Sequence, residues 1–188
     1  GREEELIGKD PTAIASLGVG LSFVPEDRLG MGLVGSMDLT DNMMLRSFRK
    51  GHSWFTNRKD PKRLAEKVVE ELEVNTPGVS TPVRRLSGGN VQKVLVGREI
   101  AAAPTVLLTA YAVRGLDINA SYTIYDLINK QKQSGVAVVF VGEDLDVLLE
   151  LCDRILVLCG GKVSGIVEKP DASRKPEVGM MMTRLGGK

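Results

Sequence analysis

The sequence has little histidine and cysteine, few aromatic residues and almost no net charge. The single histidine, His52, and the two cysteines, Cys152 and Cys159, are too few for a zinc finger or a thiolate cluster. A histidine-dependent triad would have to use His52, in a stretch typical of a loop. Two cysteines in 188 residues form no disulfide framework, which favours a reducing, cytosolic compartment. The 25 basic and 24 acidic residues leave a formal charge of +1, and this balance gives no sign of nucleic-acid binding.

Long apolar runs are also missing. No segment approaches the roughly 18 apolar residues that span a bilayer, and the acidic start, residues 1–5, has no apolar signal region. Hydrophobic residues make up 43% of the chain, which is ordinary for a globular protein and too high for a disordered one. We therefore expect a soluble protein that reaches a membrane, if at all, through a partner.

Apolar runs alternate with helical patterns in the second half of the chain. Continuous apolar runs at 106–110, 136–141 and 155–158 predict strands, and Gly160-Gly161 predicts a hairpin into 162–167. Helices are expected from about residues 90 and 120, and a third helix carries an inner apolar side: Leu145, Leu148, Leu149 and Cys152. The alternation predicts an α/β fold, with a mostly parallel sheet covered by helices on both faces.

The first half adds one strand and a helical insertion. Residues 21–24 predict a buried strand that Pro25 ends, and Asp38 begins a capped helix. A longer helix is expected to start at Asp60 as N-cap, followed by Pro61, with an apolar stripe: Leu64, Val68 and Leu72. We therefore expect a core lobe formed by 1–27 and 86–188, with a helical subdomain and linker at 28–85.

The segment Leu86-Ser87-Gly88-Gly89-Asn90-Val91-Gln92-Lys93 carries the chemistry. A serine and two glycines at a helix start offer a hydroxyl and approachable backbone N–H groups at the positive end of the helix dipole, which suits a phosphate oxygen. The alternative is that Ser87 is only an N-cap and the glycines only form a turn. The short motif alone leaves these two interpretations about even.

Three further segments complete a pattern with this one: Val24-Pro25-Glu26-Asp27-Arg28, Arg114-Gly115-Leu116-Asp117 and Val141-Gly142-Glu143-Asp144. In order and spacing, the four resemble the ATP-binding cassette (ABC) ATPase family over nearly the whole chain. The resemblance makes LSGGN the family signature, Asp117 part of the D-loop, Glu26 the Q-loop position and Glu143 the switch-histidine position. It implies a P-loop NTPase-like core, truncated at the N-terminus, like the second, degenerate half of tandem subunits that import simple sugars or nucleosides.

The sequence departs from the family at the hydrolytic positions. It contains no G-x-x-x-x-G-K-[ST] phosphate-binding loop. Where the second Walker motif of the family ends in Asp-Glu, this chain has Ala110-Tyr111, which offers neither a magnesium-holding carboxylate nor a general base. Glu143 would meet a γ-phosphate with like charge. We therefore expect no ATP hydrolysis by this chain alone and no metal site of its own.

The resemblance implies a role in trans, because each ATP in an ABC dimer lies between the phosphate-binding loop of one half and the signature of the other. Ser87, Gly88 and Gly89 would contact the phosphate that a partner half holds, and Asn90 and Gln92 would shape the turn. The expected cofactors are ATP and Mg²⁺, shared with the partner half. The other expected partners are transmembrane permease subunits on the inner, cytoplasmic face of the cell membrane.

Two alternatives accompany this hypothesis. The chain could be a structural or regulatory lobe that docks on a transporter without binding nucleotide. ATPases of DNA repair and chromosome structure also carry an LSGG signature, but they predict long heptad segments and a basic surface, and the sequence has neither. We therefore expect no nucleic-acid partner.

Overall fold

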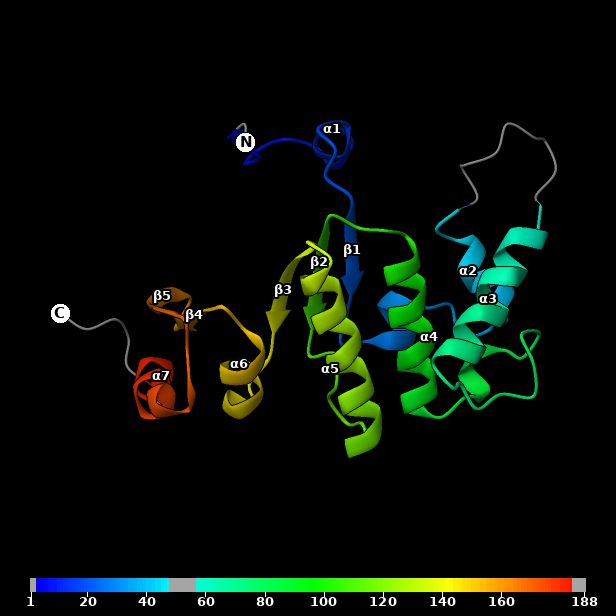
Figure 1. The fold of residues 1–188 in the computed structure, drawn as a ribbon. Coiled ribbons are helices and arrows are strands. Elements are labelled where there is room, and N and C mark those ends of the chain that lie inside the picture. The colour runs from blue at the N-terminus through cyan, green and yellow to red at the C-terminus, as the bar shows by residue number, and fades with distance from the viewer. Residues whose placement is uncertain (1–2, 48–56, 184–188) are drawn as a thin grey trace. The chain divides into compact units, whose positions relative to one another are not determined.

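The computed structural model describes residues 3–47 and 57–183, and the predicted loop around His52 lies outside these residues. The chain divides into two compact units, Gly1–Val139 and Phe140–Lys188, which we call unit 1 and unit 2. Figure 1 shows their elements in chain order. In the described ranges, no helix combines the length and the apolar composition that a membrane crossing requires.

A three-stranded sheet lies mostly in unit 1, although the end of its third strand, Phe140 and Val141, belongs to unit 2. Its order is β1 (Leu21–Val24), β2 (Val106–Ala110) and β3 (Ala137–Val141), and β1 and β2 run parallel with Leu21 opposite Val106. All three strands were predicted from their apolar runs. Burial alternates along β1 and β2, and the fully buried positions are Ser22, Val24, Leu107 and Thr109. Along β3, exposed and half-buried residues alternate.

The helices of unit 1 are α1 (Pro11–Ser16), α2 (Leu39–Met44), α3 (Lys59–Glu71), α4 (Gly88–Ala101) and α5 (Ile118–Gln133). Short helical turns lie at Arg28–Gly32 and Val83–Arg85. The predicted start of α2 is confirmed, because the Asp38 carboxylate accepts the Asp41 N–H at 2.7 Å. The prediction that 28–85 forms a subdomain of its own stays a prediction.

Helix α3 begins earlier than expected. Its N-cap is Arg58 without a side-chain cap bond, so the prediction of Asp60 as N-cap is wrong. The Lys62 N–H already bonds to the Arg58 carbonyl at 3.0 Å, which places Asp60 inside the first turn. Pro61 is still tolerated there, because the first N–H groups of a helix have no partner within it.

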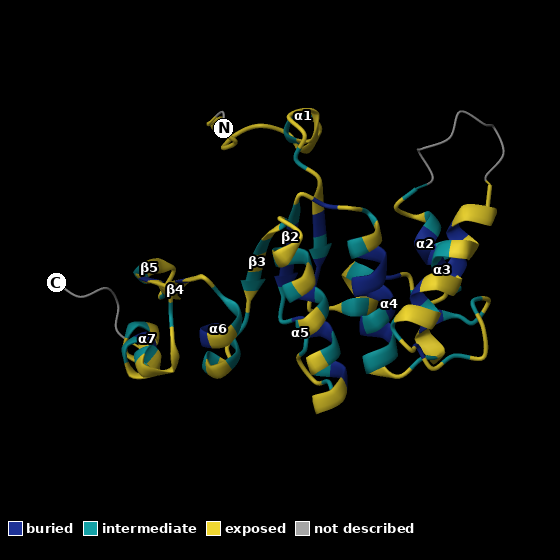
Figure 2. Ribbon diagram, viewed as in Figure 1, coloured by how far each residue is buried: buried dark blue, intermediate teal, exposed yellow. Residues whose placement is uncertain are grey.

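Helix α4 is the centre of unit 1. Most of its residues are buried, as Figure 2 shows, in contrast to the exposed outer surfaces of α3 and α5. A Cβ atom at Gly97 would lie 2.7 Å from Cγ1 of Val68 and 3.0 Å from Cδ1 of Leu72, so α3 and α4 pack in direct contact at this glycine. Two members of the predicted apolar stripe of α3 therefore face α4.

A buried ion cluster attaches the far end of α4 to β1. The Glu99 carboxylate, whose side chain is 2% exposed, lies 2.9 Å from Nη2 of Arg98 and 3.1 Å from Nη2 of Arg46. It also accepts the backbone N–H of Phe23 at 3.3 Å, and the Glu99 carbonyl accepts the hydroxyl of Ser22 at 2.8 Å. Burial lowers the pKa of Arg98 and Glu99 opposes that shift. The cluster therefore connects α4, β1 and the turn after α2.

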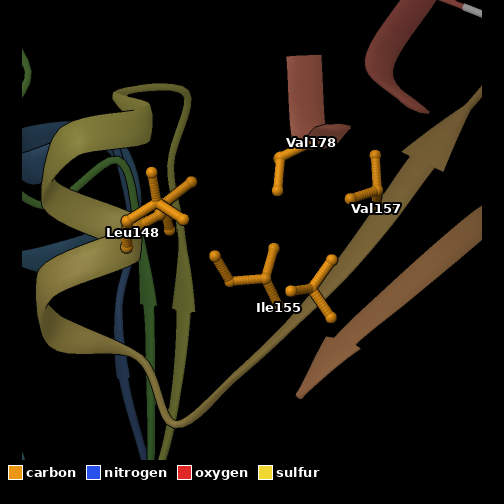
Figure 3. Close-up of a cluster of buried hydrophobic side chains, with 6 residues drawn as sticks. Leu148, Ile155, Val157 and Val178 are labelled. Atoms are coloured by element: carbon orange, nitrogen blue, oxygen red, sulfur yellow. The ribbon is translucent and has the colours of Figure 1, made fainter. Parts of the chain in front are cut away.

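Unit 2 contains α6 (Leu145–Leu151), the antiparallel hairpin of β4 (Arg154–Cys159) and β5 (Lys162–Glu168), the turn Ala172–Arg174 and α7 (Lys175–Thr183). The predicted Gly160-Gly161 turn is confirmed, with φ values of +55° and +75° that suit glycine. In Figure 3, Leu148 from α6 and Val178 from α7 point toward Ile155 and Val157 of β4. The predicted inner side of α6 therefore faces the small core of this unit.

Candidate functional site

The signature segment begins α4, as predicted. Ser87 is the N-cap, and its Oγ accepts from Nδ2 of Asn90 at 2.9 Å and from the backbone N–H of Asn90 at 3.5 Å. The Oδ1 of Asn90 in turn accepts the backbone N–H of Asn75 at 3.0 Å. Ser87 and Gly88 are exposed. Because the serine oxygen only accepts in these bonds, its hydroxyl proton remains available to an external acceptor.

The two signature glycines allow close contact with neighbouring elements. A Cβ atom at Gly89 would lie 3.3 Å from Cβ of Ala120 and 3.7 Å from Oδ2 of Asp117. A Cβ atom at Gly88 would lie 3.4 Å from Nη1 of Arg28. The start of α4 therefore lies against the start of α5 on one side and against Arg28 on the other.

The D-loop position, Asp117, is the N-cap of α5. Its Oδ1 accepts the Ala120 N–H at 2.9 Å, and its backbone carbonyl accepts the hydroxyl of Ser121 at 2.9 Å. The side chain is exposed beside Gly89. The structure thus brings the predicted signature and D-loop residues together.

Two arginines that sequence reasoning did not single out join these segments. Arg28 Nε donates to Oε1 of Gln92 at 2.8 Å, and Arg28 Nη2 donates to the backbone carbonyl of Arg114. Arg114 Nη1 pairs with Oε1 of Glu26, the Q-loop position, at 2.7 Å. Burial lowers the pKa of Arg28, and the nearby Glu26 opposes the shift. In the sequence, the one indication of this pair was the opposite charge of Glu26 and Arg114, which stand in two of the family motifs.

Gln92 is fully buried in α4, although the resemblance groups it with the exposed signature residues. Its Oε1 accepts from Arg28, while its Nε2 has no hydrogen-bond partner among the described residues. Among residues 3–47 and 57–183, one other buried side-chain polar atom has no hydrogen-bond partner, and this is Oγ1 of Thr109 in β2. Gln92 is therefore an interior residue of α4 that bonds to Arg28, and its predicted role in shaping the turn stays a prediction.

The positions that the resemblance predicts to be degenerate lie at the end of β2 and in unit 2. Ala110 is the last residue of β2, and Tyr111 follows with φ +50°, a left-handed conformation that is uncommon for a bulky residue. The Arg114 guanidinium lies over the Tyr111 ring, 5.8 Å from its centroid. Glu143 is exposed, and it belongs to unit 2, next to the α6 N-cap Asp144. Within the described residues, no three acidic, histidine or cysteine side chains gather as metal ligands.

Comparisons with known proteins place this site in context. No family model matches the chain. It is 39% identical to the xylose import ATP-binding protein XylG of Moorella thermoacetica, over 92% of this chain and 34% of that protein. It is 36% identical to the ribose import ATP-binding protein RbsA of Rhodopirellula baltica, over 83% of this chain and 31% of that protein. The chain thus spans about a third of the length of the curated relatives it matches.

Solved structures show the same fold. An ATP-binding cassette in a dimeric, post-hydrolysis state with bound ADP and Pi superposes with a TM-score of 0.71 at 21% identity. The match covers 86% of this chain and 68% of that chain. The predicted α/β fold with flanking helices is therefore confirmed.

Proposed function

The chain belongs to the ATP-binding cassette family, and from this premise we propose that it is part of the ATP-binding subunit of an importer for simple sugars or nucleosides. In this role its signature would complete the ATP site of a partner ATPase half. The matched relatives are named as xylose import and ribose import ATP-binding proteins, which supports a sugar over a nucleoside as the imported substrate. The observation that carries the proposal is the exposed Ser87 hydroxyl at the start of α4, with its proton available.

The start of α4 suits a phosphate that approaches from outside the chain. Ser87 would donate its hydroxyl proton to a phosphate oxygen of ATP, and the first N–H groups of α4 would add the positive end of the helix dipole. Gly88 and Gly89 leave room for the phosphate to approach the backbone. These donors would stabilise the charge that develops on the phosphate during hydrolysis. Asp117, beside Gly89, would transmit the state of the site to the partner.

The chain's own hydrolytic side does not fit the nucleotide. The end of β2 offers the methyl group of Ala110 and the ring of Tyr111, and the Arg114 guanidinium lies 5.8 Å from the centroid of that ring. These groups would neither hold Mg²⁺ nor activate water. ATP and Mg²⁺ would therefore be held by the partner half. We propose that the chain alone hydrolyses no ATP and that it works at the cytoplasmic face of the membrane, on permease subunits.

A docking lobe that never contacts nucleotide is the second candidate. One observation favours it: Ser87 is the N-cap of α4, and this structural role accounts for a serine at position 87 without any bound nucleotide. The two candidates differ in what Ser87 does for the partner.

The test is ATP hydrolysis by a competent partner half assembled with this chain. Replacing Ser87 with arginine fills the approach to α4, and keeping the phosphate away from the backbone N–H groups of the helix start should lower the partner's rate by about a hundredfold. Ser87→Ala, which keeps the space, should lower it less. Ser16→Arg places the same side chain at an exposed position of α1 and should change nothing. An unchanged rate with Ser87→Arg would favour the docking lobe, and Mg²⁺-dependent hydrolysis by this chain alone would overturn the proposed inactivity.

A further inference from the structure

Arg28 donates hydrogen bonds both to the signature helix and to the segment before the D-loop. Its Nε donates to Gln92, four residues after the exposed Gly88, and its Nη2 donates to the carbonyl of Arg114, three residues before Asp117. The guanidinium is half-buried, and it lies against the backbone of Gly88. Its planar fork holds two acceptors from different segments at a fixed separation, which a flexible ammonium group does not do.

Gln92 depends on this arginine. Its side chain is fully buried, its Nε2 has no partner among the described residues, and its Oε1 accepts only from Arg28. Without Arg28, both polar ends of a buried amide would lack partners, and the first turns of α4 would have to move to satisfy them.

The segment that carries Arg28 is itself fixed. The Asp27 carboxylate accepts the N–H of Gly30 at 2.8 Å, which closes the helical turn Arg28–Gly32. At the far end of this turn, Nη2 of Arg98 donates to the Gly32 carbonyl at 2.7 Å. The turn is therefore attached to α4 at both ends, through Gln92 and through Arg98. These contacts restrict the backbone of Arg28 and therefore the position of its side chain.

The approach to the D-loop is held by the same region. Arg114 is bound through its carbonyl by Arg28 and through its side chain by Glu26. The Glu26 pair is between exposed groups, with 47% of the Glu26 side chain accessible, so water weakens it. The bond from Arg28 to the Arg114 carbonyl is exposed as well, and the part-buried bond of Arg28 is the one to Gln92.

We propose that Arg28 is a positioning residue, which sets the start of α4 relative to the D-loop by bonding to Gln92 and to the Arg114 carbonyl. The inference rests on the proposed function, because the geometry that Arg28 sets matters when Ser87 and Asp117 meet a partner's nucleotide. Arg28 acts through these residues and does not itself contact the phosphate. Its loss should therefore lower kcat of the partner's hydrolysis more than it raises KM for ATP.

The experiment compares Arg28→Ala, Arg28→Lys and Gln92→Leu in the assembly with a competent partner half. Arg28→Ala should reduce kcat by about tenfold, the effect of losing one protected hydrogen bond to a charged group, and should change KM by less than about threefold. Arg28→Lys should recover part of kcat, because lysine can reach one acceptor. The double variant Arg28→Ala/Gln92→Leu should be no slower than the slower single variant, because both changes remove the same contact.

Controls separate positioning from folding. Arg154→Ala removes an arginine from an exposed ion pair of unit 2 and should leave kcat unchanged. Hydrogen exchange of the isolated chain should accelerate at 86–93 and 114–117 in Arg28→Ala and not in Arg154→Ala. If Arg28→Ala does not fold, the lysine variant gives the same comparison.

The outcomes distinguish this inference from the proposed function. If Ser87→Arg slows the partner while the Arg28 variants do not, the role of Arg28 is overturned and the proposed function stands. Additive losses in the double variant also overturn it, as does a reduction of kcat/KM that arises from KM alone. If Ser87→Arg has no effect on the partner, the proposed function and this inference fall together.

Discussion

Replacing Glu99 with alanine removes the carboxylate at the centre of the buried cluster in unit 1. The Glu99 side chain is 2% exposed, and it joins Arg98, Arg46 and the backbone N–H of Phe23. In the alanine variant, Arg98 keeps its bond to the Gly32 carbonyl but stays buried without a counter-charge. The Arg98 side chain is 7% exposed, so water reaches it poorly.

The magnitude follows from which arginine is left buried. Removing one partner of a buried ion pair costs about 3–5 kcal/mol, because an uncompensated charge remains in the interior. Arg98 should carry most of this cost, since Arg46 is 38% exposed and can turn toward water. Glu99→Gln keeps the shape and one acceptor, but its amide N–H groups face the donors of Arg46 and Phe23. We therefore expect the glutamine variant to lose less stability than the alanine variant.

Urea unfolding of the chain measures this difference. A loss of 3–5 kcal/mol corresponds to a decrease of about 2 M in the urea midpoint for a slope that is usual for small domains. Glu168→Ala is the matched control, because Glu168 pairs with Arg154 at 2.8 Å with both side chains more than 60% exposed. Exposed pairs contribute about 0–1 kcal/mol. A midpoint shift for Glu99→Ala no larger than that for Glu168→Ala would refute the reasoning.

Two further predictions concern a helix contact and acid stability. Gly97→Ala should lower the free energy of unfolding by about 1–2 kcal/mol, because the overlap of the new Cβ with Val68 outweighs the gain in helix propensity. Gly179→Ala, with open space around it in α7, should raise the free energy of unfolding by about 0.5–1 kcal/mol. Urea midpoints measure both changes, and midpoints that shift in the same direction would contradict the packing account. The bond from Arg174 lowers the pKa of Glu177, so its stabilising effect is present above the ordinary pKa range of a carboxyl group and is lost as the pH falls through the lowered value. An NMR titration should show a depressed pKa of Glu177 that returns to its ordinary value in Arg174→Ala.

Local features of the chain were predictable because they depend on neighbouring residues. The strand at 21–24, the capped helix at Asp38, the start of α4 at Ser87 and the Gly160-Gly161 hairpin each follow from caps, turns or apolar runs of a few residues. The predicted start of α3 was wrong because the helix lacks such a local signal. Its first turn begins at Lys59 without a side-chain cap, so no residue type marks it.

Long-range pairs were not predictable in this way. Arg28 and Gln92 are 64 residues apart, and Arg114 and Glu26 are 88 residues apart. Whether such distant side chains meet depends on the register of β1 against β2 and on how α4 packs against β1. A local sequence pattern specifies neither. The exposure of β3 has a similar origin, since an apolar run predicts a strand without stating which of its faces other elements cover.

These two classes of contact meet on α4, and this arrangement explains how a short exposed motif can have a fixed geometry. The start of the helix at Ser87 is exposed, and the same helix is held further along by Arg28 at Gln92, by α3 at Gly97 and by β1 at Glu99. Because a helix transmits a displacement along its axis, a change at Glu99 or Gly97 should move Ser87 as well as lower stability. Variants at these buried positions that still fold should therefore weaken the proposed trans effect on a partner, although none of them touches the nucleotide.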